Sequence, residues 1–263
     1  MFEYDLVEYF DSLVHATSDG LWLGGDRYDA SIKRLLQEMD KAEVRRACLV
    51  AIADFAESAD VYQFWQGYPD RFVPIGSMNP GRAEDPQAAT RAVYALAEQG
   101  FQGLKLHSRL NEYHPLDPRA LAAIQAAGAV GMVVFLDTLF RQRRHATAPA
   151  ADIIDRIALA CPGTQVVLLH GGASEMLQVF EIVRMHAHLI LDLSFTLLRY
   201  GGSSLEKDMR FVCENLDQRV TVGSDFPEYT QQEMIEMFES ITDGLPEDKL
   251  NRIRHDNLAE LFS

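Results

Sequence analysis

Several side chains that can bind metals or move protons stand where short apolar runs of this sequence stop. His15, His107, Asp137, His170 and Asp225 each end or directly follow such a run. The C-terminal ends of parallel strands meet at one face of a barrel, so shared placement at strand ends predicts that these groups converge. Imidazole and carboxylate groups around one point suit either a divalent metal or acid–base catalysis.

These histidines and aspartates offer imidazole nitrogens and carboxylate oxygens as metal ligands. Such a mixture of nitrogen and oxygen ligands suits one divalent ion, with zinc as the first expectation and manganese as the alternative. A bound metal would bring the pKa of a water molecule toward neutrality, and a nearby carboxylate or imidazole would then take its proton.

Lys105 and His107 are predicted to point into the same space as this set. They are two residues apart in a strand-like run, and alternation places both on one face. A lysine on an interior strand should pair with a carboxylate, for which Asp137 or Asp225 would serve, or bind an anionic substrate group. We therefore expect Lys105 to act in catalysis with His170 and Asp225, and His107 to contact the substrate.

The loops at the same end of the sheet supply further candidates. Arg109 and Tyr113 follow the Lys105 strand and are predicted to contact the substrate. The segment Trp22–Tyr28 contains glycines and aromatic residues, which suits a mobile cover. Asp192 and Ser194 also end an apolar run, but an ordinary role at a strand end is the stronger interpretation for them.

The elements that must position these residues alternate along the whole chain. The predicted strands are Glu8–His15, Arg46–Ile52, Phe72–Ser77, Gly103–His107, Met132–Asp137, Gln165–His170, Leu189–Ser194 and Val220–Ser224. The predicted helices are Asp29–Met39, Asp85–Gln99, Asp117–Ala127, Ala150–Ala160, Ser174–Met185, Ser204–Asn215, Gln231–Ile241 and Glu247–Phe262. Eight β/α units in order predict an α/β fold, a single (β/α)₈ TIM barrel over residues 1–263 as one domain. Neither GxGxxG nor GxxxxGK follows the first strand, which disfavours a nucleotide-binding fold.

Composition excludes some partners. A formal charge of −15 argues against nucleic acid, because neutralising phosphates needs a basic surface. The basic cluster Arg141, Arg143, Arg144 and His145 is interpreted as a solvated loop, with anion binding as the alternative. The apolar stretch Leu121–Leu136 contains two glycines and is interpreted as a helix end, a turn and a strand, so no membrane partner is expected.

Three widely spaced cysteines, Cys48, Cys161 and Cys213, stand in apolar runs. An odd number in such settings predicts reduced core thiols, and the acidic start of the chain shows no signal-peptide pattern. Both observations favour a cytoplasmic protein. A small molecule is the expected partner, and a homo-oligomer stays open.

Five sequence motifs in order resemble a known family. They are Asp11-Ser12-Leu13-Val14-His15, the run Gly100–His107, Leu169-His170-Gly171-Gly172, Gly223-Ser224-Asp225-Phe226-Pro227 and the tail Asp256–Phe262. Over nearly all 263 residues the chain is similar to the amidohydrolase superfamily, in its amidohydrolase-related (amidohydrolase 2) branch of metal-dependent hydrolases and decarboxylases. The resemblance implies a metal ligand at His15, a ligand or acid/base at His170, and a ligand and general base at Asp225.

The chain departs from the family pattern at two positions. The first strand of the family carries Asp-x-His-x-His, but Leu13 stands at the first histidine here. The fifth-strand histidine is replaced by Asp137, which can still bind a cation. The metal set that the resemblance then implies is His15, Asp137, His170 and Asp225. It lacks one ligand, and such a loss commonly weakens metal affinity strongly.

The leading hypothesis is a metal-dependent hydrolase of a small carboxylated amide, lactone or ester, acting through metal-activated water. Non-oxidative decarboxylation is a close alternative within the same branch. A metal-free enzyme would instead use Lys105, His107, His170 and Asp225 for acid–base work. A non-catalytic barrel that binds a ligand is the remaining alternative.

Overall fold

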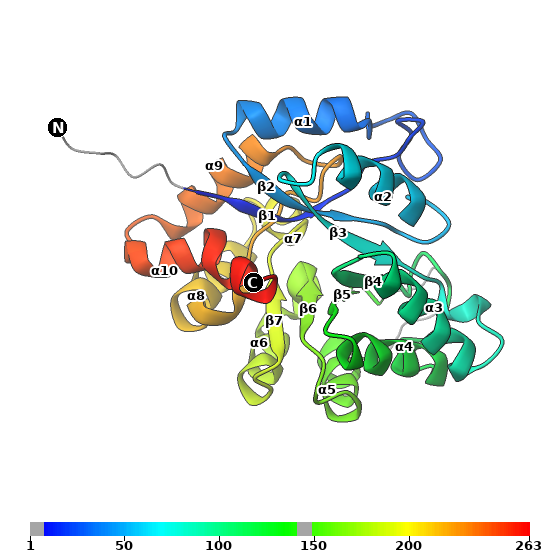
Figure 1. Cartoon of the computed structure of the whole chain (residues 1–263). Coiled ribbons are helices and arrows are strands. Elements are labelled where there is room, and N and C mark those ends of the chain that lie inside the picture. Colours follow the sequence, from blue (N-terminus) through cyan, green and yellow to red (C-terminus); the bar gives the residue numbers. More distant parts are fainter. Residues whose placement is uncertain (1–7, 141–148) are drawn as a thin grey trace.

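The computed structural model describes residues 8–140 and 149–263, so the basic cluster Arg141–His145 lies outside the described residues. Eight parallel strands follow one another around the molecule in sequence order (Figure 1). They are β1 Phe10–Val14, β2 Arg46–Val50, β3 Phe72–Ser77, β4 Gly103–Leu106, β5 Val133–Asp137, β6 Val166–Leu169, β7 Leu189–Asp192 and β8 Val220–Thr221. The predicted (β/α)₈ TIM barrel is confirmed.

The barrel closes between its first and last strands through backbone hydrogen bonds beyond the end of β8. Ser12 N donates to Val222 O at 3.1 Å, Asp225 N to Leu13 O at 2.9 Å, and His15 N to Phe226 O at 2.9 Å. Regular pairing in β8 ends at Thr221, and the backbone leaves the extended conformation at Asp225, whose φ is +61°. The predicted strand Val220–Ser224 is accordingly shorter in the structure.

Helices cover the outside of the strands (Figure 1). The α-helices are α1 Ile32–Lys41, α2 Ser58–Gly67, α3 Pro86–Glu98, α4 Pro118–Ala129, α5 Ala150–Ala160, α6 Met176–Met185, α7 Thr196–Arg199, α8 Leu205–Asn215, α9 Gln231–Thr242, α10 Glu247–Asn251 and α11 Asn257–Leu261. A π-helical turn, Arg252–Asp256, joins the last two, so the predicted closing helix is one nearly continuous element. Within the described ranges, no helix has the length and apolar character needed to cross a membrane.

Local chemistry explains where helices begin. Asp85 and Asp117 each accept a hydrogen bond from a backbone N–H of the next helical turn, with proline as the first helical residue. Thr230 and Glu233 form a reciprocal capping box at the start of α9. Helix α2 was not among the predicted helices, because its pattern mixes polar and aromatic residues and buries only Val61 fully.

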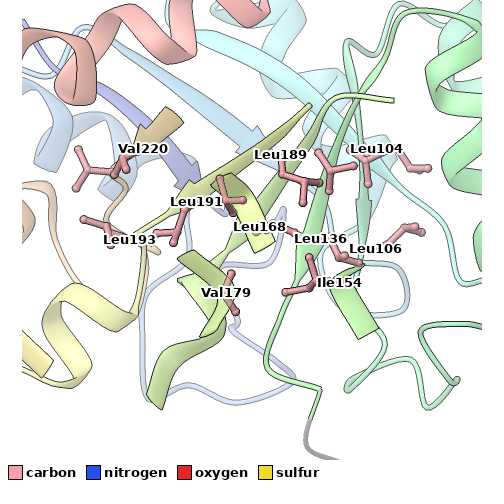
Figure 2. Packing of buried hydrophobic residues seen from close by; sticks show 14 of the residues in the cluster. Leu104, Leu106, Leu136, Ile154, Leu168, Val179, Leu189, Leu191, Leu193 and Val220 are labelled. Atoms are coloured by element: carbon pink, nitrogen blue, oxygen red, sulfur yellow. The ribbon is translucent and has the colours of Figure 1, made fainter. Parts of the chain in front are cut away.

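Two apolar layers hold the barrel together. Outward-facing strand residues pack against helices, as Figure 2 shows for Leu136 and Leu168 beside Ile154 of α5 and Val179 of α6. A smaller interior cluster comprises Phe10, Leu13, Cys48, Val50, Val73, Ile75, Val133, Phe135, Val167, Leu169, Ile190 and Leu258. The interior cluster fills the barrel from within, and the strand-end residues of the site lie beyond it at the rim.

Candidate active site

The C-terminal ends of the strands surround a small cavity of about 40 Å³. Six of the predicted site residues line it: His15, Lys105, His107, Arg109, His170 and Asp225. A seventh, Asp137, lies directly behind with no exposed surface. Convergence of strand-end residues, the central expectation from the sequence, is thus what the fold produces.

Two imidazoles are held in the same way. His15 Nδ1 lies 2.6 Å from Val50 O, and His170 Nδ1 lies 3.0 Å from Ser194 O. A carbonyl oxygen only accepts, so both Nδ1 atoms carry a proton. Each Nε2 consequently turns toward a carboxylate, and the neutral forms of both rings present a lone pair there.

Asp137 is the carboxylate that faces two imidazoles. Its Oδ2 lies 3.3 Å from Nε2 of His107 and 3.3 Å from Nε2 of His170. Burial disfavours the charged carboxylate, but the two imidazoles and Lys105 outweigh this and lower the pKa of Asp137. Burial also lowers the pKa of His107, to about 3, so His107 is neutral near pH 7.

The pKa of His170 shifts in the opposite direction to that of His107. Burial disfavours the imidazolium, but the hydrogen bond with Asp137 and the charge of Asp225 outweigh burial, so the pKa of His170 is raised. When it is protonated, His170 carries a proton on Nε2 at the cavity and can donate it there. His170 is therefore suited to act as a general acid.

Lys105 brings a positive charge into the site. Its side chain is 1% exposed. Burial lowers the pKa of Lys105 to about 8, and the charges of Asp137 and Asp225 oppose this fall. The ammonium form thus prevails at neutral pH, stabilised by the two carboxylates that the sequence had named as its partners.

Asp11 fixes the backbone next to Asp225 through two hydrogen bonds to Ser224. Ser224 donates its N–H to Asp11 Oδ1 at 2.9 Å and its hydroxyl to Asp11 Oδ2 at 2.6 Å. Burial raises the pKa of Asp11 to about 6. Asp225 Oδ1 lies 3.6 Å from His15 Nε2. Burial raises the pKa of Asp225, but the nearby His15, His170 and Lys105 outweigh burial, so its pKa is lowered.

The predicted metal ligands contact one another in two pairs, His15 with Asp225 and His170 with Asp137. Among the residues that the structure describes, no three His, Cys, Asp or Glu side chains form a group that could hold a metal ion. Leu13, at the position where the resemblance implies a first-strand ligand, is fully buried in the interior cluster.

Charge balance leads to the same conclusion. The ammonium of Lys105 already opposes the two buried carboxylates, Asp137 and Asp225. A divalent cation would have to displace this charge or be repelled by it. With no group of three ligands among the described residues, the side chains present do not fit the zinc or manganese that the resemblance implies.

A second cavity of about 200 Å³ adjoins the first. Arg109, Leu139 and Phe195 line both, and Arg199 and Tyr200 complete one side of the larger one. Within the described ranges, neither arginine takes part in an ion pair within 4.0 Å. The sequence analysis missed Arg199, because it lies on the four-residue helix α7 with no strand-end signal.

The loop after β1 covers the smaller cavity. Trp22 stacks on His15 with ring centroids 4.8 Å apart, and its indole N–H donates to Glu228 Oε1 at 3.1 Å. Trp22 and Leu23 line this cavity, as predicted for a cover. Tyr113 is buried but lines neither cavity, so the structure does not bring it to the substrate space.

The comparison with protein families matches residues 21–263 to the amidohydrolase family. The chain belongs to the amidohydrolase family. The comparison with curated proteins found no match. The family assignment agrees with the resemblance carried by the five motifs.

Solved structures with the same fold cover nearly the whole chain. An uncharacterised TIM-barrel protein from Bordetella bronchiseptica has a TM-score of 0.81 at 18% identity, over 97% of this chain and 98% of that chain. A probable 2-pyrone-4,6-dicarboxylic acid hydrolase from Acinetobacter baumannii, with citric acid bound, has a TM-score of 0.70 at 16% identity, over 97% and 98%. A 5-carboxyvanillate decarboxylase from Novosphingobium aromaticivorans, complexed with manganese and a nitrobenzoic acid, has a TM-score of 0.71 at 12% identity, over 97% and 95%. At these identities the likeness concerns the fold.

Proposed function

We propose that this amidohydrolase is a hydrolase of a small carboxylated lactone, ester or amide, and that its own side chains supply the acid–base chemistry. The observation that carries this proposal is the buried ammonium of Lys105 between Asp137 and Asp225 at the rim of the barrel. A buried cation beside a general acid supports electrophilic activation of a carbonyl without a metal.

The reaction uses three residues around the smaller cavity. Asp225 accepts a proton from a water molecule as that water attacks the substrate carbonyl carbon. The Lys105 ammonium and the His170 imidazolium stabilise the negative charge that forms on the carbonyl oxygen. The tetrahedral intermediate then collapses, the bond to the leaving atom breaks, and His170 Nε2 gives that atom its proton.

The two cavities differ in size, and each suits a different part of the substrate. A volume of about 40 Å³ holds roughly three water-sized groups, enough for a carbonyl and the attacking water. The cavity of about 200 Å³ takes the remainder of the molecule. Arg109 and Arg199 on its wall support a carboxylate on that remainder, because a guanidinium binds a carboxylate through paired hydrogen bonds.

Non-oxidative decarboxylation is the second candidate. The raised pKa of His170 favours it, because a proton must reach the carbon that loses carbon dioxide. The two reactions differ in their products. Hydrolysis releases acid without carbon dioxide, whereas decarboxylation releases carbon dioxide.

The test uses protein dialysed against a chelator and assayed near pH 7 with a panel of carboxylated lactones, esters, amides and aromatic acids. We expect acid release that chelation does not diminish. Lys105→Met should lower kcat by about 10²–10³-fold, the effect of removing one group that stabilises an oxyanion. Lys41→Met is the matched control, because the Lys41 side chain is 68% exposed on α1 and lines neither cavity.

Each other outcome corrects the proposal in a different way. Carbon dioxide release would favour the second candidate. Turnover that appears only after zinc or manganese is added would overturn the metal-independent chemistry. Binding of panel members without turnover of any of them would indicate the non-catalytic barrel.

A further inference from the structure

The ring of His170 is held by one residue, Ser194, at the end of β7. His170 Nδ1 lies 3.0 Å from Ser194 O and 3.3 Å from Ser194 Oγ. The carbonyl oxygen can only accept, so Nδ1 is the donor. The hydroxyl oxygen can either accept or donate, so its role depends on where its own proton goes.

Asp192 decides that role. Its Oδ1 accepts the N–H of Ser194 at 3.0 Å and also the hydroxyl proton of Ser194. A serine hydroxyl has one proton, and here it is committed to Asp192. Ser194 Oγ therefore turns a lone pair toward His170, and both oxygens of Ser194 accept from Nδ1–H.

The carboxylate of Asp192 is itself fixed by two neighbouring strands. Its Oδ2 accepts from Ser12 Oγ of β1 at 2.5 Å and from Thr221 Oγ1 of β8 at 2.8 Å. Asp192 has no exposed surface. Four donors converge on one buried carboxylate, so its orientation, and that of Ser194, is strongly determined.

The backbone beside Ser194 is strained where it leaves β7. Phe195 has a φ of +59° and packs edge-on against His170, with ring centroids 5.5 Å apart. A non-glycine residue in this region persists only where its surroundings over-determine it. The two bonds from Ser194 to Asp192 precede this kink directly and hold it.

We propose that Asp192 is a positioning residue of this site: acting through the Ser194 hydroxyl, it keeps the neutral His170 ring protonated on Nδ1 and so keeps Nε2 available at the cavity. The tautomer claim stands on geometry alone. Its value for catalysis rests on the proposed function, in which Nε2 exchanges a proton with the substrate.

Asp192 could instead serve only to hold strands β1, β7 and β8 together, and this role makes different predictions that two controls test. Thr221→Val removes one hydrogen bond between strands at Asp192 but leaves the bonds of Asp192 to Ser194. Asp11→Asn alters another fully buried carboxylate that joins strand β1 to the segment after β8, yet contacts no imidazole. Neither control should change the tautomer of His170.

The experiment is long-range ¹H–¹⁵N correlation of imidazole groups in protein labelled with ¹⁵N-histidine, at alkaline pH where the ring is neutral. Loss of one signal in His170→Gln assigns the residue. Wild type should show the Nδ1–H form. In Asp192→Asn a neutral amide oxygen replaces the charged acceptor and binds the Ser194 hydroxyl more weakly, so the hydroxyl can turn to donate to Nδ1. The tautomer ratio should then move toward Nε2–H by roughly two- to tenfold, the range that one neutral hydrogen bond supports.

The double variant tests the route. In the Ser194→Ala background, Asp192→Asn should leave the ratio unchanged, because the hydroxyl that relays the effect is gone. Ser194→Ala alone should keep the Nδ1–H form through the carbonyl, but its Nδ1 proton should exchange with water roughly two- to tenfold faster after losing one acceptor. This variant keeps the inference testable should Asp192→Asn fail to fold.

Three results would overturn the inference. The first is an unchanged tautomer ratio in Asp192→Asn. The others are a shift of the same size when Asp192→Asn is made in the Ser194→Ala background, or in Thr221→Val alone. An unchanged proton exchange rate in Ser194→Ala would do the same. Failure of the proposed function is distinguishable, because the tautomer would then respond as described while no substrate of the panel turns over.

Discussion

Raising the pH from 7 to 9.5 is expected to stabilise the wild-type protein relative to Lys105→Met by about 2 kcal/mol. The Lys105 side chain is 1% exposed, and burial lowers its pKa from 10.5 to about 8. Between pH 8 and 10.5, Lys105 keeps its proton in the unfolded chain but has lost it in the folded chain. Stability therefore rises with pH over this interval, and the cost of burying the ammonium is fully present only below about pH 8.

The magnitude follows from the interval between the two pKa values. From 10.5 to about 8 is about 2.5 pH units, and at about 1.36 kcal/mol for each unit the complete effect is about 3.4 kcal/mol. Somewhat more than half of it, about 2 kcal/mol, develops between pH 7 and pH 9.5. Burial raises the pKa of Cys48, Cys161 and Cys213, so these thiols lower the stability as pH rises. Both proteins contain them, and the difference between wild type and variant removes their contribution.

The assay is urea unfolding of both proteins at several pH values, monitored by circular dichroism, with m-values checked for constancy. Lys41→Met, on an exposed side chain, should show no such pH-dependent difference from wild type. A wild-type minus Lys105→Met difference that stays constant from pH 7 to 9.5 would refute the reasoning, because the buried site would then not depress the pKa of Lys105.

Three further expectations concern the metal, the barrel closure and the cover. Elemental analysis of chelator-dialysed protein should find far less than one zinc or manganese per chain and an unchanged Tm; a stoichiometric metal would contradict the charge-balance argument. Gly223→Ala should cost roughly 1–3 kcal/mol of stability by urea unfolding, because a Cβ there would meet Leu13 N at 2.8 Å and Ser12 Oγ, whereas Gly163→Ala meets nothing within 4 Å and should cost much less. Trp22→Phe removes the N–H that binds Glu228, so limited proteolysis within residues 18–30 should become roughly two- to tenfold faster, and an unchanged rate would show that this bond does not hold the cover.

Much of the fold could be predicted from the sequence because β/α alternation is a local property. Apolar runs of strand length, separated by helical periodicity, identified all eight strands within a few residues. The phase of each strand also placed His15, Lys105, His107, His170 and Asp225 at one rim, since alternation decides which face a side chain occupies. Helix α2 was not predicted, because its apolar residues do not recur at helical spacing strongly enough and only Val61 is buried.

Only the tertiary structure decided which of these groups meet. Asp137 was predicted as a metal ligand, yet it faces the imidazoles of His107 and His170. The contact of Asp192 with Ser194, and of Ser194 with His170, joins the ends of β6 and β7. The place of Arg199 beside the larger cavity follows from a kink after β7. Periodicity along one strand carries no information about the stagger between strands or the path of a loop, and those two properties determine the distances on which the chemistry of this site depends.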